Sequence, residues 1–168
     1  LMLDGVELLA PRHGIEGYLS RGSTFGIPLL HPWANRLASP HQVVGDVAWD
    51  VVVGSPGVHP DDNGLPIHGL VAGLDAWEVV IEEASDGEAR LSAVLRWDES
   101  LDRFPSFPFP HELRVDVVVS GSVLRVSTTL TAGELEVPVA FGWHPWFEFP
   151  DVAREDWELH SPFVRRAV

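Results

Sequence analysis

Short segments in which apolar and polar residues alternate restrict the fold of this chain more than any other feature. Five segments show the pattern: residues 43–53, 76–83, 89–97, 111–119 and 124–130. Successive side chains of a strand point to opposite faces, so a period of two predicts strands with one apolar face. Turn signals such as Ser120-Gly121 separate the runs, and no long segment has helical periodicity. We therefore predict an all-β, antiparallel β-sandwich in one domain spanning residues 1–168.

Charge and composition restrict the partners. The formal net charge is −14, and all 11 basic residues are arginines. Such a surface repels nucleic acid and anionic lipid headgroups, so we expect neither a nucleic acid nor a membrane partner but a neutral small molecule. The absence of cysteine excludes disulfides and thiol catalysis. No apolar segment is long enough to span a bilayer, and we expect a cytoplasmic protein.

Two loops rich in Pro, Gly, Asn and His interrupt the strands, at residues 26–37 and 59–73. Binding residues often lie on such loops when a rigid scaffold holds them. In the first loop, Arg36 offers a planar fork of donors that suits sugar hydroxyls or a carboxylate, although it could also pack on Trp33 at the surface. In the second, a neutral His68 can both donate and accept a hydrogen bond, although backbone groups alone could satisfy it.

His144 is the third candidate, in the segment VPVAFGWHPWFEFP at residues 137–150. Alternation predicts that one face of this segment is core-like, with Val137, Val139, Phe141 and Trp143. The opposite face carries the small residues Pro138, Ala140 and Gly142 before His144. Small neighbours would leave room for a ligand in front of the imidazole, but a structural histidine on an edge strand is the alternative. Nearby aromatic residues could stack on a sugar or simply fill the core: Trp33, Trp143, Trp146 and Phe147.

A metal site is a further possibility for His59, Asp61, Asp62 and His68, which lie close together in the sequence. Two histidines and two carboxylates can bind zinc or manganese, but their spacing matches no defined metal motif. The sequence also has no nucleophile-elbow serine and no glycine-rich phosphate loop. A metal site is therefore the less favoured interpretation of these residues.

Four segments together resemble the aldose 1-epimerase (galactose mutarotase) family. They are GIPLLHPWANRL, GLPIHGL followed by Trp77, FPFPHELRV and VPVAFGWHPWF, in the family's order over roughly residues 14–150. The similarity is greatest to bacterial members with a PWANR-type loop. It implies a large antiparallel supersandwich with an open sugar cleft. It also implies interconversion of the α and β anomers of free aldoses such as glucose or galactose, without a cofactor.

The resemblance also implies roles for individual residues. Arg36 and His68 fall where the family binds sugar hydroxyls, and Asn35 belongs to the same Asn-Arg pair. His144 falls where the family places its general acid, and a histidine, with an ordinary pKa near 6.5, can protonate a ring oxygen near neutrality. Trp146 stands where Tyr or Phe is more usual, and with Trp33 it is expected to contact the sugar.

One departure from the family bears on activity. The family's catalytic Glu and a sugar-binding Asp lie well downstream of the HPWF-type motif, and only 168 − 146 = 22 residues follow Trp146. We therefore expect a domain truncated at both ends, incomplete on its C-terminal side and weakly active as given. The alternatives are a non-catalytic carbohydrate-binding sandwich, a hexose-6-phosphate 1-epimerase, and a cupin-like metal enzyme built on His59, Asp61 and His68.

Overall fold

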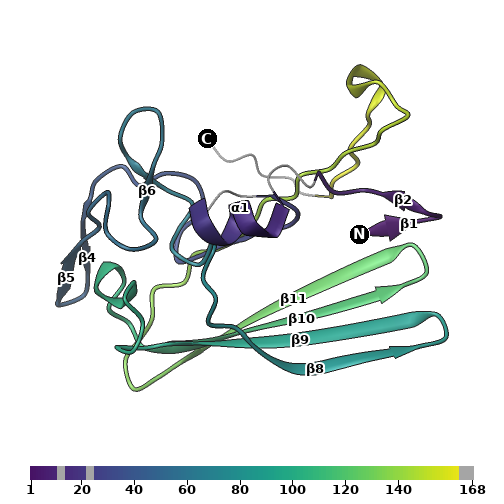
Figure 1. Cartoon of the computed structure of the whole chain (residues 1–168). Coiled ribbons are helices and arrows are strands. Elements are labelled where there is room, and N and C mark those ends of the chain that lie inside the picture. The colour runs from purple at the N-terminus through teal and green to yellow at the C-terminus, as the bar shows by residue number, and fades with distance from the viewer. Residues whose placement is uncertain (11–13, 22–24, 163–168) are drawn as a thin grey trace.

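An antiparallel meander of four strands forms the framework of the computed structural model (Figure 1), which describes residues 1–10, 14–21 and 25–162. The strands are β8 (Glu78–Ser85), β9 (Glu88–Trp97), β10 (His111–Ser120) and β11 (Val123–Ala132). They lie side by side in the order β11-β10-β9-β8. The prediction of an all-β, antiparallel fold is confirmed, because these four strands coincide with four of the five alternating segments.

Two tight turns set the register of this sheet. Ser85 pairs with Glu88 across one turn, and Ser120 pairs with Val123 across the other. Each turn contains a glycine in the left-handed region, Gly87 at φ +88° and Gly121 at φ +56°. Two-residue hairpin loops need positive φ, so glycine at these positions fixes which side chains of each strand share a face.

The remaining elements are short. The described residues also form four two-stranded sheets. In two of them β1 (Met2–Leu3) pairs with β2 (Val6–Glu7), and β3 (Leu29–Leu30) pairs with β12 (Gly142–Trp143). In the other two β4 (His41–Val44) pairs with β5 (Val47–Asp50), and β6 (His59–Pro60) pairs with β7 (Pro66–Ile67). One helix, α1 (Gly14–Arg21), and two 3₁₀ turns, η1 (Phe104–Ser106) and η2 (Arg154–Asp156), complete the described fold. Among the described helices, none has the length and apolar character needed to cross a membrane.

The segment 43–53 differs from its prediction as a single strand. Gly45, at φ +58°, turns the chain between β4 and β5, and Val44 pairs with Val47. Beyond Asp50 the chain leaves the hairpin, and Val51 is fully buried while Val52 is 56% exposed. The alternating pattern therefore does mark strand residues, but Gly45, which can adopt positive φ, divides the segment into the two strands of a hairpin.

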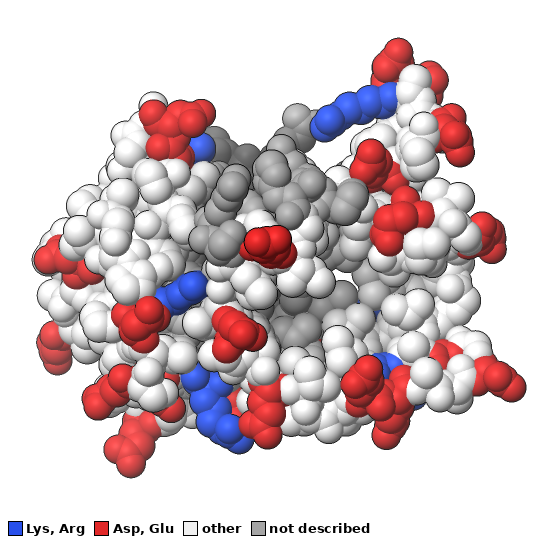
Figure 2. Space-filling view, viewed as in Figure 1, with Lys and Arg blue, Asp and Glu red and all other residues white. Residues whose placement is uncertain are grey.

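The hydrophobic core lies where the loops of the N-terminal half cover one end of the sheet (Figure 1). Its buried members are Leu29, Trp33, Val51, Val58, Leu70, Val71, Leu95, Trp97, Phe107, Phe109 and Leu113. Burial decreases along β9, since Leu95 is fully buried and Leu91 is 41% exposed. On the surface, carboxylates are spread over the face in Figure 2 and arginines are far fewer. The core thus fastens the two loops that carry predicted site residues to the sheet.

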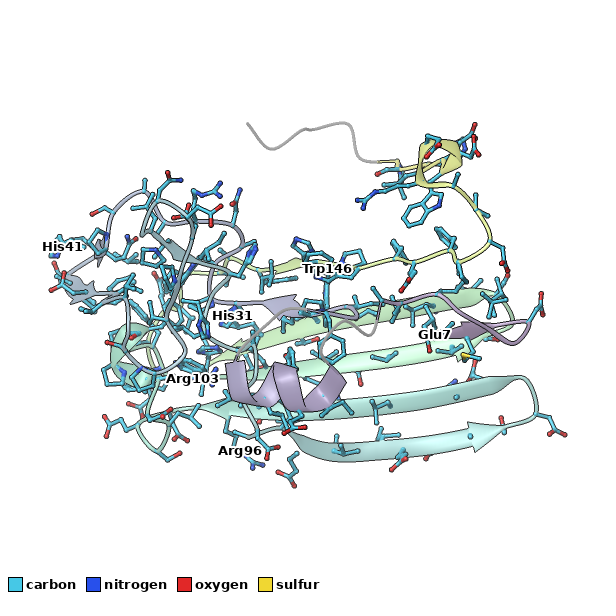
Figure 3. All side chains as sticks on the ribbon, turned by 45° about the horizontal axis from the view of Figure 1, so that its top comes forward. Glu7, His31, His41, Arg96, Arg103 and Trp146 are labelled. Atoms are coloured by element: carbon cyan, nitrogen blue, oxygen red, sulfur yellow. The ribbon has the colours of Figure 1, made fainter. Side chains whose placement is uncertain are left out.

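Arg103 fastens the second loop directly. Its Nη1 donates to the carbonyls of Leu70 at 2.5 Å and Ala72 at 2.8 Å, and its Nη2 donates to that of Gly73 at 3.4 Å. Figure 3 shows Arg103 at the end of the sheet that the loops cover. A planar fork of donors can hold several carbonyls at once, so one side chain fixes the segment that follows His68.

The two loops also meet through their backbones. The amide of Leu70 donates to the carbonyl of His31 at 2.6 Å, and His31 and Gly69 form a parallel bridge. Gly69 has φ +72°, and a Cβ added there would overlap the backbone of His31. Glycine is therefore required at position 69 both for its conformation and for the space between the loops.

Replacing this glycine tests the loop contact. Gly64→Ala is a matched control, because Gly64 lies in the same loop at φ +78° with no atom within 4 Å of the added Cβ. The control should lower the free energy of unfolding by about 1–2 kcal/mol, the cost of a left-handed alanine. Gly69→Ala should cost about 1–3 kcal/mol more, because the methyl group also displaces the His31 backbone. Denaturant unfolding of both variants measures this; equal losses would contradict a close loop contact.

Candidate functional site

His68 and His144 face each other although 144 − 68 = 76 residues separate them in sequence. Their ring centroids lie 5.4 Å apart with an interplanar angle of 79°. Loop 26–37 anchors both backbones, since the amide of His68 donates to the Asn35 carbonyl at 2.9 Å and that of His144 to the Pro28 carbonyl at 3.1 Å. The short pairings β3–β12 and Arg36–Ile67 place the two histidines on either side of this loop.

His68 has an unusual backbone and an unused ring nitrogen. It adopts φ +68°, which costs a residue with a Cβ about 1–3 kcal/mol and is commonest at functional sites. Within the described part of the chain, its buried Nδ1 has no hydrogen-bond partner. Burial lowers the pKa of His68 below its usual range, and the neighbouring His144 and Arg36 lower it further. The imidazole is therefore neutral near pH 7 and can both donate and accept.

An ion pair orients Arg36. Its Nε donates to Oδ2 of Asp61 at 2.6 Å, and the guanidinium side chain remains 48% exposed. The other Asp61 oxygen accepts the amides of Asn63 and Leu65, each at 2.9 Å. The Leu65 amide and then Arg36 hold the pKa of Asp61 far below its usual range. The carboxylate is thus ionised at neutral pH and orients the arginine through its Nε.

Asp61 is a residue whose role sequence reasoning missed. The sequence suggested only a metal-ligand role for it, with His59, Asp62 and His68. In the structure its carboxylate instead accepts hydrogen bonds from Arg36 and from two loop amides. Among the described residues, no group of three or more His, Cys, Asp or Glu side chains is arranged to hold a metal ion. The signal available was the DDNG run itself, in which Asp commonly accepts the amide two residues ahead.

The two predicted tryptophans lie in different environments. The ring of Trp146 stacks on His144, with centroids 5.0 Å apart and an interplanar angle of 19°. Its amide donates to the Gly26 carbonyl at 2.8 Å, which ties the segment after His144 to the first loop. Trp33 is 7% exposed and packs in the core. Trp146 therefore lies beside the imidazoles, and Trp33 supports the loop from beneath.

The predicted two faces of residues 137–144 are correct only in part. Gly142 and Trp143 pair with β3, and Val137 and Trp143 pack against the core. Val139 and Phe141, expected to be core-like, are 59% and 42% exposed. Residues 133–141 pair with no other strand of the described structure, so nothing imposes a period of two on them.

An open groove of about 1110 Å³ begins at His144 and Trp146 and continues along residues 147–159. Arg36 and His68 do not line it. Of the three predicted polar residues Arg36, His68 and His144, only His144 therefore lines this groove. A neutral imidazole, a fixed guanidinium and an aromatic ring together suit an uncharged ligand with several hydroxyls.

The histidine pair makes a prediction for titration. Replacing His144 by Gln should raise the pKa of His68, because a neighbouring positive charge disfavours protonation. The pKa should stay below the ordinary value, since burial remains the larger cause. Imidazole carbon-bound proton shifts followed by NMR measure it, with His41→Gln as a control because the His41 side chain is 62% exposed elsewhere. An unchanged His68 titration in His144→Gln would contradict the close pairing.

Comparison with known proteins agrees with this fold. The family model for aldose 1-epimerase matches residues 3–164. A galactose mutarotase-like protein from Clostridium acetobutylicum is 20% identical with a TM-score of 0.69, over 85% of this chain and 41% of that one. The Slr1438 protein from Synechocystis sp. PCC 6803 is 25% identical with a TM-score of 0.59, over 76% and 38% respectively. No curated protein matches in sequence.

The chain thus spans about two fifths of the length of the solved structures that it matches. At 20% identity the first of them shows the fold alone. The family match, in contrast, extends over nearly all of the chain. On that match, this chain belongs to the aldose 1-epimerase family.

Proposed function

We propose that this chain supplies the hydroxyl-binding residues and the general acid of an aldose 1-epimerase site, which interconverts the anomers of a free aldose. The observation that carries the proposal is the approach of His68 to His144 beside the fixed side chain of Arg36. These residues come from three separate segments, and the backbones of His68 and His144 are hydrogen-bonded to loop 26–37, which carries Arg36. Membership of the family supports a carbohydrate as the ligand.

In this proposal Asn35, Arg36 and His68 hold the sugar. Arg36 donates to hydroxyl oxygens from the part of its fork that Asp61 does not engage. His68, neutral because of burial and nearby positive charge, accepts from one hydroxyl and donates to another. Trp146 stacks on His144 and thereby holds the plane of that imidazole towards the bound ring. Binding and orientation then precede any proton transfer.

His144 supplies the acid in the proposed reaction. It donates a proton to the ring oxygen while a base removes the proton of the anomeric hydroxyl, and the bond between C1 and the ring oxygen breaks. The resulting aldehyde rotates about the C1–C2 bond and recloses with its other face towards the C5 hydroxyl, and both protons return. The proposal assigns no residue of the described chain to the base. The carboxylates that follow Trp146 in sequence include Glu148 and Asp151.

The charge around Arg36 bears on the phosphorylated alternative. A hexose 6-phosphate needs clustered positive charge, but the guanidinium of Arg36, which lies near His68, is already paired with the ionised Asp61. This pairing favours a neutral aldose over a sugar phosphate. A non-catalytic carbohydrate-binding module would use the same residues, so the rate of mutarotation must separate binding from catalysis.

Three variants test the roles. His144→Asn keeps an amide donor but cannot give up a proton near neutrality, so it should abolish most of the rate that the unaltered chain shows above the spontaneous one. Its Kd for galactose should change little. Arg36→Ala and His68→Asn should weaken binding about tenfold or more, because each removes a group proposed to hold hydroxyls. Polarimetry of freshly dissolved α-galactose gives the rate above the spontaneous one, and NMR titration gives Kd.

The outcomes separate the alternatives. His41→Asn serves as the control, since His41 is exposed and pairs with Asp50 in the β4–β5 hairpin. If His144→Asn weakened binding and left the rate at saturation unchanged, His144 would be a binding residue. Aldose binding by the unaltered chain without any rate above the spontaneous one would favour a carbohydrate-binding module.

A further inference from the structure

His31 is a buried histidine that the proposed chemistry does not use. It lies four residues before Asn35 and is 0% exposed. Figure 3 shows it where the loops meet the covered end of the sheet. Its Nε2 lies 3.0 Å from Nε2 of His111, the first residue of β10, and its Nδ1 lies 3.2 Å from the carbonyl of Ala140. A buried polar ring with contacts on both nitrogens has a defined orientation.

These contacts reach every segment of the candidate site. The His31 carbonyl accepts from Leu70, two residues after His68. The imidazole lies against Ala140, four residues before His144, and it belongs to the loop that carries Asn35 and Arg36. Through His111 the same ring is joined to the central sheet.

A count of protons defines how the pair is bonded. His111 Nδ1 lies 2.7 Å from the Phe109 carbonyl. The two rings thus make three polar contacts, one with each other and two with carbonyl oxygens, which can only accept. Three hydrogen bonds would need three N–H groups, but two neutral imidazoles carry two. Burial lowers the pKa of both rings, that of His31 to about 3, so a third proton is disfavoured near neutrality.

The distances indicate which contact lacks a proton. The 2.7 Å contact of His111 with Phe109 requires the proton on Nδ1, which leaves Nε2 of His111 as an acceptor. The 3.0 Å contact between the two Nε2 atoms then requires the proton of His31 to lie on Nε2. The 3.2 Å approach of His31 Nδ1 to the Ala140 carbonyl, the longest of the three, is then the contact without a shared proton.

We propose that His31 is a positioning residue, which donates from Nε2 to His111 and thereby fixes the first loop to the sheet and sets the approach of His68 to His144. Only the expected changes in sugar affinity rest on the proposed function. The arrangement of the two site imidazoles can be measured without any sugar.

The protonation of the pair is the first test. Long-range proton–nitrogen correlation NMR of the unaltered chain at neutral pH distinguishes the two tautomers of each ring. We expect the proton of His31 on Nε2 and that of His111 on Nδ1. A proton on Nδ1 of His31, or a doubly protonated ring in the pair, would overturn the proposed bond. This measurement needs no variant and no ligand.

Two substitutions then separate positioning from stability. The amide of Gln reaches about as far as Nε2, and that of Asn about as far as Nδ1, so only His31→Gln can still donate to His111. His31→Gln should keep the nuclear Overhauser contact between His68 and His144 and hold the Kd for galactose within about threefold. His31→Asn should lose the contact and weaken binding about tenfold or more, as small displacements in a site do. The control is Leu95→Ala, which truncates a fully buried core residue on β9.

Each result decides the proposal. Retention of the His68–His144 contact in His31→Asn, or its loss in His31→Gln, would overturn it. Equal losses in Leu95→Ala and His31→Asn would also overturn it, because general destabilisation would then explain them. If His31→Asn does not fold, His31→Gln and the tautomers decide. If the unaltered chain binds no aldose, the proposed function fails, whereas the imidazole contact still decides the role of His31.

Discussion

The close contact between the backbones of His31 and Gly69 is the constraint on which the candidate site depends. It holds loop 26–37 against loop 59–73, and no residue with a Cβ fits at position 69 without moving the His31 backbone. Asn35 and Arg36 follow His31 by four and five residues in the first loop, and His68 immediately precedes Gly69 in the second loop. The core beneath and the Arg103 clamp keep the two loops from separating. The strained backbone of His68, at φ +68°, is thus held by packing on both sides.

Burial gives two histidine pairs of this chain different roles. His31 and His111 are 0% and 6% exposed, hydrogen-bond each other and have lowered pKa values, so they act as neutral polar groups inside the core. His68 and His144 are partly exposed and face each other, and His144 lines an open groove. In our proposals, the first pair orders the structure and the second pair belongs to the sugar site.

The sequence predicted the regular part of the fold well because local physics determines it. Alternation located β8, β9, β10 and β11, and the glycine turns closed the hairpins where turn residues stand. The motifs also picked out His68 and His144, which the structure brings face to face. The pairing of Arg36 with Asp61 and of His31 with His111 could not be read in advance. Their partners lie 25 and 80 residues apart, and only the tertiary fold brings them together.

Alternation failed where strands lack neighbours. Val139 and Phe141 have the pattern of a half-buried strand, but residues 133–141 pair with no described strand and both side chains are exposed. A period of two predicts a buried face only when another layer covers that face.

A crystal structure of the chain with a bound aldose tests the central claim most directly. The account predicts sugar hydroxyls within about 2.6–3.2 Å of Arg36 and His68, with the ring oxygen towards His144. A sugar bound only along the groove at residues 149–159, away from Arg36 and His68, would contradict it. So would imidazoles of His68 and His144 that lie apart in the complex.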